Sequence, residues 1–424
     1  MSVLSAHFPP PPPRPPPAHP HRAAAATGDD IAALLERHGS AAWDIEFGGF
    51  LTNHLTHGLI ALHSLGSPAS LIQRFVAEYQ LKLLPTPPLP TPTTSSPPPP
   101  STVAELGLRG DFHALCQAYD RATVGLSASE LRGAVCEHLG LLLDGAGGAA
   151  FHAFIHLCLG VRTDCRPLVI EGLAYLAHSW LPVGGDVASL AGWGRDGQLS
   201  VLEAAAAIRS EGVLQALLLQ AWPSVEKLPT GYFQRCMHVF AAFGGSPETR
   251  EATDELRRYA RRVALPREPR EAAAVLLDAA LQVFVRSVGC DYFLLHGVTA
   301  AFSLVSLLDA CPMLEGEAAS RACQRMLLGL LAAFVAQRLP TLCPLAAVVP
   351  ATPPDDSAWD QLRREAVTDT EPLRNEHAWK MVWMCFEHRQ QHARSSDHAL
   401  FFAAARKCLR SSLTGRSGEA PLAL

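Results

Sequence analysis

Apolar residues recur along most of the chain at the spacing of an α-helix. In the segment FLTNHLTHGLIALHSLG (50–66) they fall at positions i, i+3, i+4 and i+7, which places them on one helical face. The same spacing continues to Leu413, whereas the alternating apolar and polar runs typical of β-strands are rare. The pattern predicts an all-α fold, in which one large helical domain covers residues 29–413 and holds a metal or ligand site between its helices.

Start and stop signals locate the predicted helices. Asp or Ser precedes several of them as an N-cap, Pro68 opens another, and Gly66 ends the helix before it. Residues 340–356 contain several prolines and are expected to form a loop. We expect helices over residues 29–38, 46–65, 67–84, 111–123, 127–143, 145–160, 167–180, 200–222, 249–264, 269–287, 290–311, 317–339, 369–392 and 396–413.

Three segments depart from the helical pattern and are expected to be disordered or flexible. Residues 1–28 form a proline-rich tail, residues 85–101 a proline-rich insert within the helical domain, and residues 414–424 a polar tail. Proline-rich segments of this kind cannot bury enough apolar surface to offset the entropy lost on ordering. We therefore expect the first two segments to be dispensable for stability.

Composition narrows the class of protein. Apolar residues make up 48% of the chain and charged residues 18%, with a net charge of −5, which is typical of a soluble globular protein and gives no basic field for nucleic acid. Purely apolar runs such as Leu327–Ala336 have about half the length that crosses a bilayer, so we expect no transmembrane segment. The eleven cysteines include no CxxC pair, which argues against a zinc ribbon or a disulfide framework and favours a reducing compartment. We expect a cytoplasmic protein, although the lack of acidic residues before Asp29 also fits an organelle transit peptide.

Histidines recur in four motifs, two of which contain a close pair. In NHLTH (53–57) and in FHAFIH (151–156) two histidines stand about one helical turn apart, so both imidazoles leave the same face. A single histidine on an apolar helix is usually a hydrogen-bonded core residue, but helical bundles also build metal sites from side chains on facing helices. We expect one histidine of each pair to converge with the two single ones within about 5 Å of a shared metal, and the spacing does not choose within a pair. The candidate metal ligands are His54, His57, His152, His156, His296 and His377.

Lys380 lies three residues after the last of these histidines, on nearly the same helical face. The chain holds only four lysines and thirty-one arginines. Because arginine is used at most basic positions, a lysine indicates a position where arginine would not serve. The ordinary explanation is a residue whose apolar stem packs between Trp379 and Met381. A buried lysine can also lose its charge, act as a base, or take up carbon dioxide as a carbamate that resembles a carboxylate ligand. Lys380 is therefore the candidate catalytic residue and a further candidate metal ligand.

Taken together, these motifs resemble the questin oxidase-like family, which includes oxidoreductases of fungal aflatoxin and anthraquinone pathways. The resemblance is carried, in chain order, by NHLTHGLIALHSLG, FHAFIHLCLG with EGLAYLAHSW, HVFAAFGGSP, LLDAALQVFV with DYFLLHGVT, and HAWK, and it spans residues 43–398. It implies an all-α oxidoreductase of secondary metabolism that oxygenates a polycyclic aromatic or polyketide substrate by Baeyer–Villiger-like or ring-cleaving chemistry. Members are described either as NADPH-dependent oxidases or as non-haem iron oxygenases.

No dinucleotide fingerprint supports the NADPH alternative in this chain. Residues 192–197 match GxGxxG, but no predicted strand precedes them, so the match does not indicate a nucleotide site. We therefore expect iron as the cofactor, with dioxygen and a hydrophobic aromatic molecule as its partners, while NADPH and a non-catalytic helical interaction protein remain the alternatives. Candidate groups around the ligands are Asn53, Glu171, Asp291 and Thr299.

Overall fold

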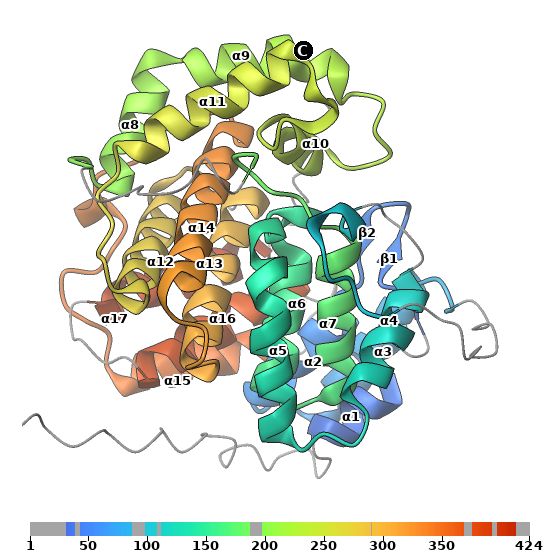
Figure 1. Ribbon diagram of the computed structural model, residues 1–424. Coiled ribbons are helices and arrows are strands. Elements are labelled where there is room, and N and C mark those ends of the chain that lie inside the picture. The colour runs from blue at the N-terminus through green and yellow to red at the C-terminus, as the bar shows by residue number, and fades with distance from the viewer. Residues whose placement is uncertain are drawn as a thin grey trace, which may run out of the picture.

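The computed structural model describes residues 31–38, 43–86, 98–107, 112–186, 197–289, 291–368, 375–391 and 397–412. Within these ranges the chain forms seventeen α-helices and a single small sheet of two strands, which confirms the predicted all-α fold (Figure 1). The expected tails at 1–28 and 414–424 lie outside the described residues, as does most of the expected insert at 85–101. Whether they are disordered stays a prediction.

The N-terminal half supplies the small sheet and the first seven helices. Strands β1 (Glu46–Phe47) and β2 (Leu51–Thr52) pair antiparallel across a tight turn, with Glu46 opposite Thr52. The helices are α1 (Ile31–His38), α2 (Leu55–Ser64), α3 (Ala69–Gln80), α4 (Phe112–Thr123), α5 (Ala128–Leu142), α6 (His152–Arg162) and α7 (Arg166–His178). In Figure 1 these elements make up the right-hand part of the molecule.

The C-terminal half contains ten helices in two groups. Helices α8 to α11 form a layer at the top of Figure 1, and the remaining helices pack below it and beside the N-terminal half. The helices are α8 (Val201–Glu211), α9 (Val213–Ala221), α10 (Tyr232–Val239), α11 (Pro247–Arg261), α12 (Pro269–Arg286), α13 (Tyr292–Ala310), α14 (Gly316–Ala336), α15 (Asp356–Ala366), α16 (Glu376–Gln391) and α17 (Asp397–Ser412).

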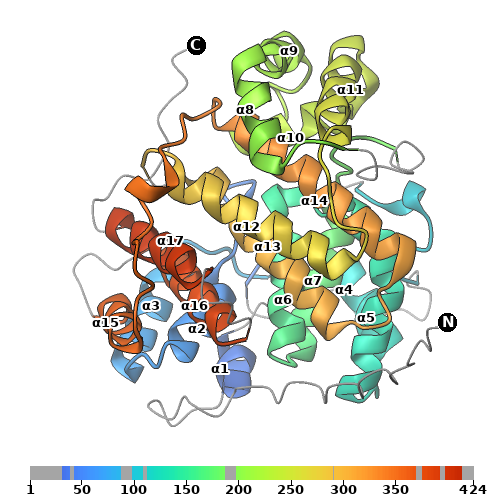
Figure 2. The ribbon, with the colours of Figure 1, turned by 90° about the vertical axis from the view of Figure 1, so that its left-hand side faces the viewer.

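Helix α13 lies at the centre of the fold. Every residue from Leu294 to Leu308 is buried, because α6, α12, α14 and α16 all pack against it. Figure 2 shows α12 and α14 running beside it. A helix that is apolar on all sides is a core helix in a globular protein. The Asp291 side chain begins this helix by accepting hydrogen bonds from the backbone N–H groups of Phe293 and Leu294, so this residue is a helix cap.

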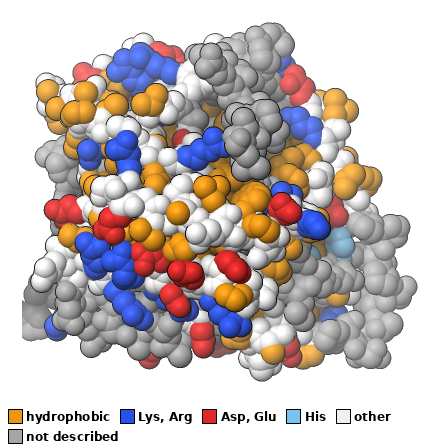
Figure 3. Space-filling model, turned by 90° about the horizontal axis from the view of Figure 1, so that it is seen from above, with side chains coloured by type: hydrophobic (Ala, Val, Ile, Leu, Met, Phe, Trp, Pro, Cys, Tyr) orange, Lys and Arg blue, Asp and Glu red, His pale blue; other side chains and the backbone are white. Residues whose placement is uncertain are grey.

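Two helices, α13 and α14, are long and apolar enough to cross a membrane by length and composition alone. Most of each is buried against other helices, with 83% of the apolar window of α13 and 72% of that of α14 inside the protein. A core helix of a globular protein meets the same test. Seen from above, basic and acidic side chains are interspersed on the visible face, with hydrophobic side chains between them (Figure 3).

The structure corrects the predicted helices in several places. The helix expected at 46–65 begins only at Leu55, because Gly48 and Gly49 adopt positive φ and turn the chain into a hairpin. The helix expected at 200–222 is two helices, since Gly212 at φ +66° ends one and begins the next. Helices α10 and α15 had no counterpart among the predicted elements.

Candidate metal centre

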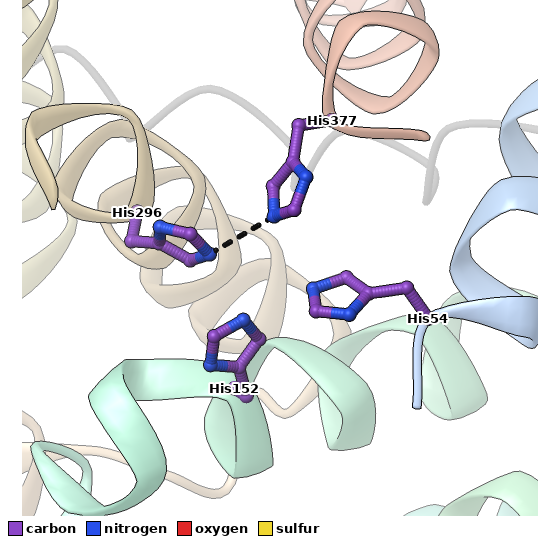
Figure 4. A group of neighbouring side chains, drawn as sticks. All are labelled: His54, His152, His296 and His377. Carbon is purple, nitrogen blue, oxygen red and sulfur yellow. Dashed lines mark hydrogen bonds between the residues drawn. The ribbon is translucent and has the colours of Figure 1, made fainter. Parts of the chain in front are cut away.

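Four histidines from four separate elements converge inside the protein. His54 directly precedes α2, His152 begins α6, His296 lies in α13, and His377 is the second residue of α16. One nitrogen of each ring lies within 4.8 Å of the others, and the rings face a common centre (Figure 4). The structure thus brings together one histidine from each close pair and both single ones. It leaves His57 and His156 outside this cluster.

The outer nitrogen, Nδ1, of each cluster histidine faces an oxygen that can only accept a hydrogen bond. His54 Nδ1 donates to the carbonyl of Thr52 at 2.7 Å, and His152 Nδ1 to that of Ala149 at 2.6 Å. His296 donates to the Tyr292 carbonyl one helical turn earlier. His377 donates to Oδ1 of Asn375 at 2.6 Å. All four imidazoles therefore carry their proton on Nδ1, and each presents an unprotonated Nε2 to the centre.

No described residue donates a hydrogen bond to these inward Nε2 atoms. Nε2 of His54 and Nε2 of His152 are buried without a hydrogen-bond partner among the described residues. Nε2 of His296 and Nε2 of His377 approach to 3.2 Å, although neither carries a proton in this tautomer. Four lone pairs directed at one point repel one another unless a cation lies between them. The donor set therefore fits a metal ion.

Protonation of the cluster is disfavoured. Burial is the largest cause that lowers the pKa of all four histidines. The nearby Lys380 also lowers the pKa of His54 and of His296, since a second positive charge would repel the imidazolium form, and the pKa of His296 falls to about 3. At neutral pH the four rings are neutral, which is the form that binds metals.

The dimensions of the cluster suit a first-row metal. With metal–nitrogen bonds of about 2.1 Å, opposed nitrogens stand about 4.2 Å apart and neighbouring ones about 3.0–3.4 Å. The 3.2 Å between the His296 and His377 nitrogens fits the neighbouring distance. The largest separation of 4.8 Å exceeds the opposed distance by only about 0.6 Å, which small rotations of the rings would close. Among the residues that the structure describes, no carboxylate belongs to the cluster, so this set of donors is all-nitrogen.

A left-handed turn sets the position of His152. Ala149, Ala150 and Phe151 all have positive φ values, of 45°, 55° and 70°, directly before α6 begins. Such a run is unfavourable for residues other than glycine, so the surrounding packing must hold it. Gly148 makes it possible, because a Cβ there would lie 1.8 Å from the Ser179 carbonyl oxygen. The turn aims the Ala149 carbonyl at His152.

Lys380 lies one turn along α16 from His377 and is completely buried, with an exposed fraction of 0%. Its Nζ has no hydrogen-bond partner among the described residues, and burial lowers its pKa to about 8. Glu376 is partly buried, which raises its pKa, and its carboxylate lies 3.5 Å from Nδ1 of His377, on the side of the ring away from the cluster. The structure thus sets Lys380 beside the cluster and Glu376 behind it.

The other candidate groups have distinct positions. Oδ1 of Asn53 accepts from the backbone N–H of Leu55 and so begins α2, and the Thr299 hydroxyl donates to the His296 carbonyl at 3.2 Å. Glu171 accepts from Nε2 of His156, and Nδ1 of His156 lies 3.1 Å from Nε2 of His57. The EGLAYLAHSW motif contained Glu171, but its contact with the unused histidines depends on tertiary packing.

Half-buried aromatic side chains adjoin the cluster at the start of α13. The Tyr292 ring lies 5.2 Å from that of His377, and Phe293 stacks on Phe233 of α10 with ring centroids 4.6 Å apart. Tyr232 packs on the same Phe293 ring at 6.0 Å. We call Tyr232, Phe233, Tyr292 and Phe293 the aromatic shelf. Such faces suit a planar ring system.

An apolar recess between α8, α12, α13 and α14 does not belong to this site. Leu294 and Gly297 line it, together with Leu331 of α14. Each residue of a helix advances about 100° around the axis, so Leu294 lies about 200° and Gly297 about 100° from His296. None of the four cluster histidines lines the recess.

Comparison with known proteins agrees with the sequence motifs. The profile of the questin oxidase-like family matches residues 51–385, which is most of the chain and includes the four cluster histidines and Lys380. No match was found among curated proteins. The chain belongs to the questin oxidase-like family.

Proposed function

We propose that this protein is a non-haem iron oxygenase that acts on a polycyclic aromatic substrate. Its family supports the general class of oxidoreductase. The observation that carries the finer proposal is the set of four buried imidazoles, each held by an Nδ1 hydrogen bond so that an unprotonated Nε2 faces the centre. His54, His152, His296 and His377 would hold the metal.

The four histidine donors and membership of the questin oxidase-like family together favour iron over other metals. Imidazole suits iron, zinc, copper and nickel alike, and a metal that activates dioxygen must exchange electrons, which excludes zinc. Bound iron would supply the activation of dioxygen that an oxygenase requires. The chain itself contributes fixed ligand orientation, exclusion of bulk water and a neutral set of ligands.

Lys380 is proposed as the source of an oxygen ligand. Non-haem iron sites usually take an oxygen ligand from Asp or Glu, and no described Asp or Glu belongs to the cluster. The lowered pKa of Lys380 makes its neutral amine accessible near neutral pH. That nitrogen can form a bond to the carbon of carbon dioxide and release one proton, which leaves a carbamate anion. The alternative is that Lys380 remains an amine beside the metal ligands.

The substrate is proposed to be a flat, hydrophobic aromatic molecule of the polyketide type. The aromatic shelf supports this proposal, because its half-buried Tyr292 ring lies beside that of His377. The shelf offers π-faces against which fused rings can stack. Oxygen insertion of the Baeyer–Villiger type and ring cleavage would both act on such a substrate.

The test is turnover with labelled dioxygen. Ring cleavage that places both atoms of dioxygen in the product needs no external reductant, whereas Baeyer–Villiger insertion of one atom needs two electrons to reduce the other atom to water. Protein stripped of metal, reconstituted anaerobically with Fe(II) and supplied with an anthraquinone-type substrate should therefore incorporate both atoms of ¹⁸O₂ by ring cleavage without NADPH, and one atom by Baeyer–Villiger insertion only when a two-electron reductant is added. Metal-free protein that turns over with NADPH would instead support the metal-free alternative. A chain that binds neither Fe(II) nor the aromatic substrate would support a non-catalytic interaction protein.

A further inference from the structure

The hairpin that precedes α2 is held by the hydroxyl of a tyrosine from α7. Tyr175 is completely buried, with an exposed fraction of 0%, and its hydroxyl donates to Oε1 of Glu46 at 2.9 Å. The same hydroxyl lies 2.8 Å from that of Thr52. Glu46 and Thr52 stand opposite each other in β1 and β2, so Tyr175 bridges a cross-strand pair.

The carboxylate of Glu46 sets the direction of both hydrogen bonds. An ionised carboxylate only accepts, so the single proton of the Tyr175 hydroxyl lies toward Glu46. The Thr52 hydroxyl then donates to Tyr175, because a hydrogen bond between the two oxygens needs a proton from one of them. A two-stranded hairpin alone is marginally stable in water, and these bonds fasten this one to α7.

Thr52 also orients the imidazole of His54. Its backbone carbonyl accepts the Nδ1 proton of His54 at 2.7 Å. Thr52 therefore joins two interactions, because Tyr175 holds its side chain and its carbonyl holds the imidazole. At His296 the corresponding acceptor is the Tyr292 carbonyl one turn earlier in the same helix, so helix geometry fixes it. Thr52 precedes α2, so α2 does not fix the Thr52 carbonyl in this way.

A second tyrosine holds the backbone of the same histidine. Tyr79 of α3 is buried, and its hydroxyl oxygen accepts from the backbone N–H of His54 at 3.0 Å. Tyr79 thus fixes where the residue lies, whereas Tyr175 acts on the residue whose carbonyl sets the direction of the ring.

Packing of the Tyr175 ring does not account for its hydroxyl. The ring lies in the core near Phe112, with ring centroids 6.1 Å apart, and phenylalanine would fill the same space. A buried hydroxyl is costly unless it is hydrogen-bonded, and this one bonds to the residue that orients His54. A role in positioning therefore depends on the hydroxyl, and a role in packing only on the ring.

We propose that Tyr175 is a positioning residue, whose hydroxyl acts through Thr52 to fix the direction of the His54 imidazole and so strengthens metal binding by the four-histidine cluster. The effect on metal binding rests on the proposed function, whereas the fixed direction of the ring does not. Neither Tyr175 nor Thr52 belongs to the cluster, so both act only through His54.

The first test is the tautomer of His54 in metal-free protein. Selective ¹⁵N labelling of histidine, with long-range ¹H–¹⁵N correlation and assignment by single variants, shows which ring nitrogen carries the proton. We expect His54 to be Nδ1–H in the wild type and partly Nε2–H in Tyr175→Phe, because the Thr52 carbonyl is then held less firmly. His296 is the internal reference and should stay Nδ1–H in both proteins. An unchanged His54 tautomer, or an equal change at His296, would overturn the positioning role.

The second test measures Fe(II) affinity by chelator competition in variants that lack one hydroxyl. Loss of a group that orients a metal ligand typically weakens metal affinity about 10–100-fold, and we expect a loss of about 10-fold in Tyr175→Phe and in Thr52→Val. Each variant removes one end of the same hydrogen bond, so Thr52→Val decides the question if Tyr175→Phe does not fold. Thr52→Ser keeps the hydroxyl and should remain within a few-fold of the wild type.

Tyr119→Phe is the matched control. Tyr119 is also 0% exposed, and its hydroxyl has no hydrogen-bond partner among the described residues, so this variant should bind Fe(II) like the wild type. Wild-type affinity in both Tyr175→Phe and Thr52→Val, or an equal loss in Tyr119→Phe, would overturn the proposal. A wild type that binds no Fe(II) would contradict the proposed function instead, and the tautomer of His54 would still decide what fixes its ring.

Discussion

Replacing Lys380 by methionine should make the metal-free protein more stable. The side chain is fully buried and its Nζ has no hydrogen-bond partner among the described residues, so its charge is held in an unfavourable place. Burial lowers its pKa from 10.5 to about 8. Each pKa unit corresponds to about 1.4 kcal/mol, so keeping the ammonium buried costs about 3 kcal/mol at neutral pH.

The pH dependence gives this prediction a definite sign. Between about pH 8 and 10.5 the unfolded chain retains the Lys380 proton while the folded chain has released it. Stability contributed by this group therefore rises with pH across that window. The advantage of Lys380→Met should be about 3 kcal/mol at pH 7 and should fall below about 1 kcal/mol by pH 10.

The assay is urea unfolding of the two proteins at several pH values, after chelation and in buffer free of carbon dioxide. Lys407→Met is the matched control, because the ammonium of Lys407 donates to the carbonyls of Phe284 and Ser287. That variant should lose about 2 kcal/mol, since hydrogen bonds from a charged group each contribute about 1.5–3 kcal/mol. A Lys380→Met protein that is less stable than the wild type, or a difference that does not change with pH, would refute the reasoning.

Three further predictions follow from particular residues. Ala150→Gly should raise thermal stability by about 0.5–1 kcal/mol without loss of iron, because glycine tolerates the left-handed turn; a lower melting temperature would contradict strain there. Gly172→Ala should cost about 1–3 kcal/mol in thermal unfolding, because its Cβ would lie 2.4 Å from the Cα of Leu157, and an unchanged melting temperature would show that α6 and α7 separate freely. Lys380→Arg should lose iron and activity together, since arginine cannot become neutral or form a carbamate. If metal analysis and oxygen uptake both remain normal in Lys380→Arg, only charge or bulk is needed at this position.

Helix positions were largely predictable because long apolar faces dominate this chain. Helices α12, α13 and α14 begin and end within a few residues of the predicted limits. The shorter α10 and α15 were missed, although Asp355 supplies an N-cap for α15 by accepting from the Ala358 N–H. The prolines that precede Asp355 indicated a loop more strongly than the cap indicated a helix.

The histidine motifs could be located from spacing, but the choice within each pair could not. His54 and His152 both lie at helix starts, where a carbonyl of the preceding segment accepts the Nδ1 proton and turns Nε2 inward. His57 and His156 lie one turn later, where the ring meets a neighbouring helix instead. The difference depends on the backbone conformation of the residues directly before α2 and α6. The spacing of apolar residues does not predict that conformation.

The measurement that tests the central claim most directly is the iron content of wild-type and His296→Ala protein, reconstituted anaerobically with Fe(II) and passed through a desalting column. His63→Ala is the control, because this residue lies on α2 but does not belong to the cluster. The account predicts one iron per chain in the wild type and in His63→Ala, and almost none in a His296→Ala protein that keeps its helical circular dichroism. Full iron occupancy in His296→Ala, or no iron in the wild type, would contradict it.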